Sequence, residues 1–190
     1  MTGESEGEDN AAALAEFEKH RARFYALIGH CVTRYQSVED YLPDVFGAAL
    51  GGHVERAIAI FAVARGLEAK LNLISAALTG SDQALADRWR RLLKRVADAA
   101  DARNQIAHAR TVHNAGMMIV RLGDENRSGE VTVGGSQRME LRKRMGTNES
   151  VWTLEMMIQE AERSSKLFRH LIAYTMTLKG ETVPPHLLEE

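Results

Sequence analysis

Proline is nearly absent from this chain of 190 residues, and that absence limits what the chain can fold into. The three prolines are Pro43, Pro184 and Pro185, so the long segment from residue 44 to residue 183 contains none. Because proline is the strongest helix breaker, the periodicity of the apolar residues decides the secondary structure of this segment. Apolar residues recur at alternating spacings of three and four, which is typical of helices that bury one face. The sequence therefore predicts a mainly helical protein.

Three apolar stripes precede residue 110. The first predicts one long helix, or two in series. The second predicts a helix that ends at Gly80, and Ser81 is placed to cap the helix of the third stripe. The stripes are Leu14, Phe17, Arg21, Phe24, Ile28, Cys31, Tyr35, Val38 and Leu42; Ala57, Ile60, Ala64, Leu67, Leu71, Ile74 and Leu78; and Leu85, Trp89, Leu92, Val96, Ala99, Arg103 and Ile106.

The pattern changes after residue 110. Met117–Leu122 and Glu130–Val133 are short segments rich in β-branched residues and separated by the turn-rich GDENRSG, which predicts a β-hairpin, with a third strand near Met139–Arg144. A last helical stripe follows, which Thr153 is placed to cap and Gly180 to end.

These elements predict an all-α fold, namely an up-and-down bundle of four to five long helices with a small β-hairpin insertion before the last helix. Residues 1–10 are expected to form a disordered acidic tail. Residues 11–180 are expected to form a single helical domain with the β insertion at about 116–145, and residues 181–190 a flexible tail.

Composition excludes several classes of protein. The single cysteine, Cys31, cannot form an internal disulfide, and the cysteine and histidine residues show no zinc-binding spacing, so we expect no metal or other cofactor and a cytoplasmic location. No apolar run reaches the roughly 18 residues that a membrane span needs, and no membrane contact is expected. The chain also lacks GxGxxG, GxxxxGK[ST] and GxSxG motifs, which disfavours nucleotide-fold enzymes and serine hydrolases.

One segment near the end of the third stripe carries residues suited to catalysis. Arg103 stands where the stripe requires an apolar side chain, so it needs a carboxylate partner or a cleft open to solvent and anions. Asn104 and His108 are four residues apart and therefore neighbours on a helix, whereas Arg103 points about 100° away. We expect Glu39 or Glu68 to be the partner of Arg103.

The sequence Arg103-Asn104-Gln-Ile-Ala-His108 resembles the motif of the HEPN superfamily of helical-bundle proteins, in which four to six residues, the first of them polar, separate an arginine from a histidine. The similarity extends loosely over residues 38–178 in helix order. Many members are metal-independent RNases of toxin, antiviral and RNA-processing systems. The resemblance implies an endoribonuclease that leaves a 2′,3′-cyclic phosphate. In this reaction His108 acts as acid or base, Arg103 binds the phosphate, and Asn104 orients His108 or the phosphate by hydrogen bonding. It also implies a homodimer with two motifs facing one cleft, RNA as substrate, and an antitoxin-like protein as regulator.

Charge gives modest support, because residues 82–146 hold 13 basic and 8 acidic side chains although the whole chain has a formal net charge of -2. Arg110 belongs to this basic segment and is a supporting candidate beside the motif. The alternative is a non-catalytic helical module of the same fold that binds a protein partner or a nucleotide. In that case Arg103 forms a structural ion pair, and the motif is buried, divided or covered by the β insertion.

Overall fold

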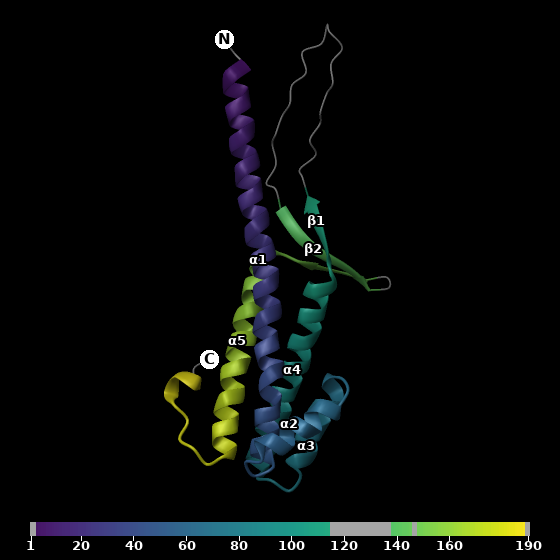
Figure 1. The fold of residues 1–190 in the computed structure, drawn as a ribbon, viewed down its shortest axis with the longest axis vertical. Helices are drawn as coiled ribbons and strands as arrows, with labels where there is room; N and C mark the ends of the chain where they lie inside the picture. The colour runs from purple at the N-terminus through teal and green to yellow at the C-terminus, as the bar shows by residue number, and fades with distance from the viewer. Residues whose placement is uncertain (1–2, 115–137, 146–147, 189–190) are drawn as a thin grey trace.

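The computed structural model describes residues 3–114, 138–145 and 148–188. Within these ranges the chain is an all-α bundle of five α-helices with three short strands between the last two helices, which confirms the predicted fold class (Figure 1). The elements are α1 (Gly3–Ala49), α2 (Val54–Val63), α3 (Leu67–Ala77), α4 (Gln83–His108), β1 (Arg110–Asn114), β2 (Arg138–Met145), β3 (Asn148–Trp152), α5 (Leu154–Leu178) and the 3₁₀ helix η1 (Pro185–Leu187).

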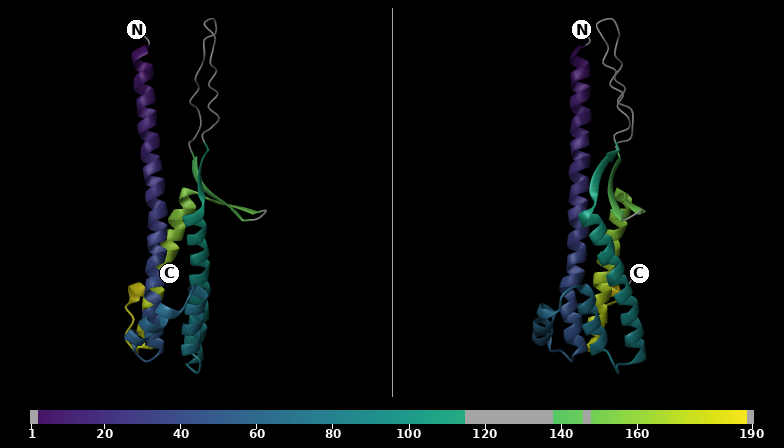
Figure 2. Two further views of the ribbon diagram at one scale, coloured as in Figure 1. Left: turned by 45° about the vertical axis from the view of Figure 1, so that its right-hand side comes forward. Right: turned by 90° about the vertical axis from the view of Figure 1, so that its right-hand side faces the viewer.

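The three longest helices, α1, α4 and α5, run side by side and enclose the main core (Figure 2). The predicted stripes supply that core, because Val38 of α1, Val96 of α4 and Leu171 of α5 are all fully buried. The first stripe forms one continuous helix, with Pro43 inside it, rather than two helices in series.

The N-terminal half of α1 extends past the ends of α4 and α5 (Figures 1 and 2). Because α1 begins at Gly3, it includes most of residues 1–10, for which the sequence predicts a disordered tail. The acidic residues of this segment lie at the N-terminus of the helix, where the helix dipole favours negative charge.

The second stripe forms two helices, α2 and α3, and the prediction of a single helix is wrong. The chain leaves the helical conformation at Ala64, which has a ψ of 118°, and Gly66 follows with a φ of 80°. A positive φ is accessible to glycine at little cost, so Gly66 allows the chain to turn before α3. The apolar pattern continues in register through this turn and conceals it.

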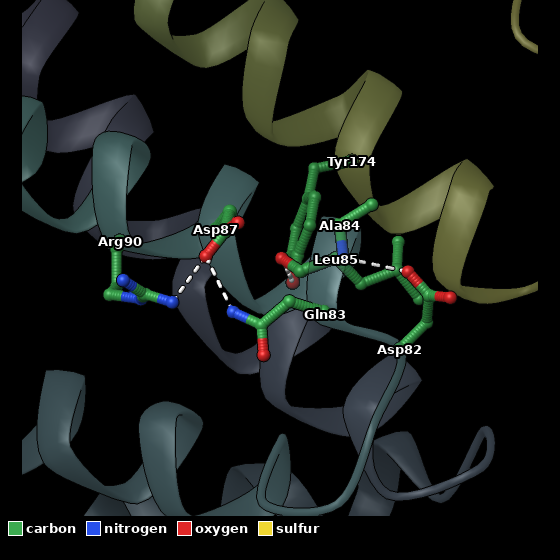
Figure 3. Close-up of polar contacts among 7 residues, drawn as sticks. All are labelled: Asp82, Gln83, Ala84, Leu85, Asp87, Arg90 and Tyr174. Carbon is green, nitrogen blue, oxygen red and sulfur yellow. Dashed lines mark hydrogen bonds and ion pairs between the residues drawn. The ribbon is translucent and has the colours of Figure 1, made fainter.

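The start of α4 is fixed by its cap and by a contact with α5 (Figure 3). Asp82 caps the helix, since its Oδ1 accepts a hydrogen bond of 2.7 Å from the backbone N–H of Ala84. The prediction of Ser81 as the cap is therefore wrong by one residue. The hydroxyl of Tyr174 on α5 donates a hydrogen bond of 3.0 Å to the carbonyl of Leu85, which holds the two helices together.

The cap of α5 is the predicted one, because Thr153 Oγ1 accepts a hydrogen bond of 3.3 Å from the backbone N–H of Met156. Gly180, with a φ of 71°, follows the end of the helix, also as predicted. Within residues 181–188, part of the segment expected to be a flexible tail, the structure contains η1 and buries Leu187, and η1 packs on α5.

The strands form an antiparallel sheet in the order β1-β2-β3. The predicted third strand near residues 139–144 lies within β2. The predicted hairpin strands, Met117–Leu122 and Glu130–Val133, lie outside the described residues. The sequence analysis did not predict β1 or β3, which directly follow α4 and precede α5.

Candidate functional site

The Arg103–His108 motif forms the end of α4, at the junction of the helical bundle and the sheet (Figure 1). The helix ends after His108 because Ala109 adopts an extended conformation, with a φ of -78° and a ψ of 151°. Arg110 then begins β1. The motif is thus held by a helix on one side and a strand on the other.

Arg103 contacts side chains from α1. Its Nη2 lies 3.5 Å from Oε2 of Glu39, and its guanidinium carbon lies 5.1 Å from the centroid of the Tyr35 ring. The other carboxylate oxygen of Glu39, Oε1, accepts a hydrogen bond of 3.2 Å from Nζ of Lys70 on α3. We call these four residues the Glu39 cluster. Its two cations and one carboxylate give it a formal charge of +1.

The Glu39 cluster is largely shielded from water. The side chains of Arg103 and Glu39 are 28% and 21% exposed, and the buried Nε of Arg103 has no hydrogen-bond partner among the described residues. The pKa of Tyr35 is raised to about 12, mainly by burial and also by the negative charge of Glu39, while the positive charge of Arg103 opposes both effects. Tyr35 therefore keeps its proton at neutral pH and presents a neutral aromatic face to Arg103, as a cation–π contact requires.

Asn104 and His108 lie on a different side of α4 from the Arg103 side chain. Both are exposed, and they are one helical turn apart. A histidine with access to solvent can exchange protons with a bound ligand, and an asparagine one turn away can donate and accept hydrogen bonds.

The structure brings Arg103 together with Glu39 but not with every residue that the sequence analysis proposed. Glu68 is exposed in the first turn of α3. Arg110 is placed by its backbone in β1. The predicted site is therefore divided into the shielded Glu39 cluster and the exposed pair of Asn104 and His108.

Sequence reasoning did not assign two members of the Glu39 cluster to the site. Tyr35 could have been found, because it lies four residues before Glu39 and so on the same face of α1. Lys70 had no comparable signal, because it lies on another helix and its contact with Glu39 depends on how α3 packs against α1.

The basic side chains of α4 are partly engaged within the molecule. Arg88 lies over the ring of Tyr174, Arg90 pairs with Asp87, and Arg95 contacts His170. Figure 3 shows the contact of Arg90 with Asp87. The exposed residues Arg91 and Lys94 add positive charge to the same helix.

No helix within the described ranges is long and apolar enough to cross a membrane. The same part of the chain contains no group of three or more histidine, cysteine or acidic side chains that could hold a metal ion.

A comparison with protein-family models finds no matching family, and no curated protein or solved structure matches the chain. Membership of the HEPN superfamily therefore stays a prediction that rests on the motif and on the order of the helices.

Proposed function

We propose that this chain is a metal-independent endoribonuclease of the HEPN type, with a site completed by a second copy of the chain. The observation that supports this proposal best is the exposure of His108 and Asn104, one turn apart at the end of α4. An acid or base must reach its substrate, and His108 meets that requirement. The proposal includes a toxin or defence role in the cytoplasm, with RNA as substrate and an antitoxin-like protein as regulator.

The proposed reaction uses the 2′-hydroxyl of RNA as the nucleophile. His108 of one copy takes the hydroxyl proton, the 2′-oxygen bonds to the adjacent phosphorus, and the bond from phosphorus to the 5′-oxygen breaks. His108 of the second copy donates a proton to the departing 5′-oxygen, and a 2′,3′-cyclic phosphate remains. Two histidines are needed because one imidazole cannot act as base and acid in the same step.

Arg103 and Asn104 would act on the phosphate. A guanidinium can bind two phosphate oxygens and stabilise the charge that develops on them. Arg103 has donors beyond the Nη2 that faces Glu39, and the formal charge of +1 on the Glu39 cluster favours an anion. Asn104 is placed to orient the phosphate or the imidazole of His108.

A non-catalytic helical module that binds a protein partner or a nucleotide is the second candidate. Two observations favour it. The motif is divided between the shielded Glu39 cluster and the exposed pair of Asn104 and His108, as expected for such a module. Arg103 is also engaged by Glu39 and Tyr35, and a guanidinium held in this way stabilises the bundle without any ligand. Under this proposal Arg103 is a structural residue, and His108 has no role in catalysis.

A cleavage assay in EDTA distinguishes the two candidates. The full chain is incubated with synthetic single-stranded RNA, and the products are examined for a terminal cyclic phosphate. We expect His108→Ala to lower the cleavage rate by about 10²–10⁴-fold, as is usual for loss of a general acid or base. The matched control is His186→Ala, since His186 is also exposed but lies in η1, and it should cleave like the unsubstituted chain.

Light scattering tests the dimer under the same conditions. Cleavage by a monomer would contradict the shared site, and an inactive unsubstituted chain or a fully active His108→Ala variant would contradict the nuclease proposal. The melting temperature of His108→Ala should match that of the unsubstituted chain, because the side chain is exposed.

A further inference from the structure

A pocket of about 540 Å³ lies between α4 and α5. This volume is within the range of about 300–1,000 Å³ that is usual for small-molecule sites. The charged side chains that line it are Arg95, Asp98, Asp101, Glu160 and Arg163, and Trp152 lies at its wall. Arg103, Asn104 and His108 do not belong to the lining, although Gln105 of the same motif does.

The most unusual residue of the pocket is Glu160 on α5, which is only 8% exposed. Its Oε2 lies 3.7 Å from Nη1 of Arg163, whose side chain is 74% exposed. Water therefore screens much of the attraction that this arginine supplies. Burial raises the pKa of the Glu160 carboxyl group, Arg163 lowers it, and the negative charge of Asp98 raises it further. A buried carboxylate is costly when its compensation is this weak.

The pocket carries an excess of negative charge when its carboxyl groups are ionised. Three carboxylates, Asp98, Asp101 and Glu160, face two guanidinium groups, Arg95 and Arg163. Arg95 is drawn toward α5 by a contact of 2.6 Å between its Nη1 and Nδ1 of His170.

An aromatic wall completes the site. The indole Nε1 of Trp152 donates a hydrogen bond of 3.2 Å to Oε1 of Gln105 on α4, which fixes the ring at the pocket. Aromatic rings attract organic cations through their electron-rich faces, and carboxylates bind such cations through charge-assisted hydrogen bonds.

We propose that the pocket between α4 and α5 binds a small organic cation, an amine or guanidinium compound, with Glu160 and Asp98 as its anionic partners and Trp152 as its aromatic wall. A bound cation reduces the repulsion between Glu160 and Asp98 and compensates the buried charge. The apolar part of such a ligand fits against Trp152 and Leu167. This proposal does not depend on RNA cleavage.

Calorimetric titration of the full chain with agmatine, which carries both a guanidinium and an amine, tests the proposal. We expect saturable binding together with a change in Trp152 fluorescence that disappears in Trp152→Phe. Glu160→Gln should weaken binding by about tenfold or more, because it removes the charge from the buried partner. The matched control is Glu162→Gln, since Glu162 lies on the same helix but is exposed and does not line this pocket.

Asp98→Asn provides a second variant if Glu160→Gln fails to fold, because Asp98 is exposed at the pocket. It should also weaken agmatine binding, while the melting temperature stays close to that of the unsubstituted chain. The proposal is overturned if agmatine and spermidine show no saturable binding, or if Glu160→Gln and Asp98→Asn both bind agmatine normally. It is also overturned if the dianion glutarate binds in place of agmatine, because the two arginines would then dominate the pocket.

Discussion

Replacement of Arg103 by alanine tests whether the Glu39 cluster stabilises the bundle. At 3.5 Å and an effective dielectric constant of about 20, the attraction between Arg103 and Glu39 would be about 5 kcal/mol. Desolvation and the ordering of two side chains offset most of this, so partly exposed pairs contribute about 1 kcal/mol. The cation–π contact with Tyr35 adds about 1 kcal/mol. We therefore expect Arg103→Ala to lower the free energy of unfolding by about 2 kcal/mol.

Lys70 limits the size of this effect. When Arg103 is removed, Glu39 keeps its contact of 3.2 Å with Lys70, so its partly buried charge stays compensated. Without that second cation the loss would approach the roughly 3–5 kcal/mol that is typical of an orphaned buried charge. For a chain of 190 residues, about 2 kcal/mol corresponds to a fall of roughly 4–8 °C in melting temperature.

Denaturant unfolding of Arg103→Ala, Glu39→Gln and the double variant measures the interaction directly. The double-mutant cycle should give a coupling energy of about 1 kcal/mol between the two side chains. His108→Ala is the control and should change the free energy of unfolding by less than about 0.5 kcal/mol. A coupling energy near zero, together with an unchanged stability of Arg103→Ala, would refute a structural role for the ion pair.

Three other perturbations test the fold. Gly66→Ala should destabilise the chain by about 1–3 kcal/mol, because an alanine is strained at a φ of 80° and a ψ of 158°, and thermal unfolding would detect this loss. Thr153→Ala should cost about 1 kcal/mol through loss of the α5 cap, whereas Thr153→Ser should restore the stability measured in denaturant. Burial raises the pKa of Tyr35 and Tyr174 to about 12. Their contribution to the free energy of unfolding should therefore be fully present below about pH 10. It should fall as the pH rises toward 12, because the unfolded chain has by then released these protons. Absorbance of tyrosinate at 295 nm, followed together with circular dichroism, should then show these two residues ionising only as the helices unfold.

The long helices could be predicted from the sequence because the helical spacing of apolar residues repeats many times along each of them. In α4, five members of the stripe, Trp89, Leu92, Val96, Ala99 and Ile106, are buried as the periodicity requires. Features that depend on one residue, such as the identity of a helix cap, were less predictable. Asp82 rather than Ser81 caps α4, and both residues have a side-chain oxygen able to accept the same kind of hydrogen bond.

The break between α2 and α3 shows a different limit. The stripe continues across Ala64 and Gly66, and a periodicity analysis registers only which side chains are apolar. The turn is a property of the backbone at Gly66, and it leaves Val63 78% exposed although it follows an apolar run. Burial in this region depends on how the α2–α3 corner packs on α1, which sequence periodicity does not determine.

The candidate site was predictable as a list of residue types but not as an arrangement. An arginine on an apolar stripe requires compensation, and this argument narrowed the partner to Glu39 or Glu68. Both carboxylates lie on helices near the core, so the choice depends on how α1 and α3 are rotated against α4. The same rotations decide that Lys70 reaches Glu39, and no local sequence signal encodes them.

A structural role for Arg103 and a catalytic one are compatible, and the Glu39 cluster explains why. If a phosphate binds the guanidinium of Arg103 in place of Glu39, Glu39 does not become an isolated buried charge, because Lys70 still neutralises it. This change of partner loses one partly exposed ion pair, between Arg103 and Glu39, which contributes about 1 kcal/mol. A charge-assisted bidentate contact between Arg103 and the phosphate can offset that loss. A loss of stability in Arg103→Ala therefore does not by itself decide between nuclease and module. His108 decides, because it is exposed, so a loss of cleavage in His108→Ala without a loss of stability has no structural explanation.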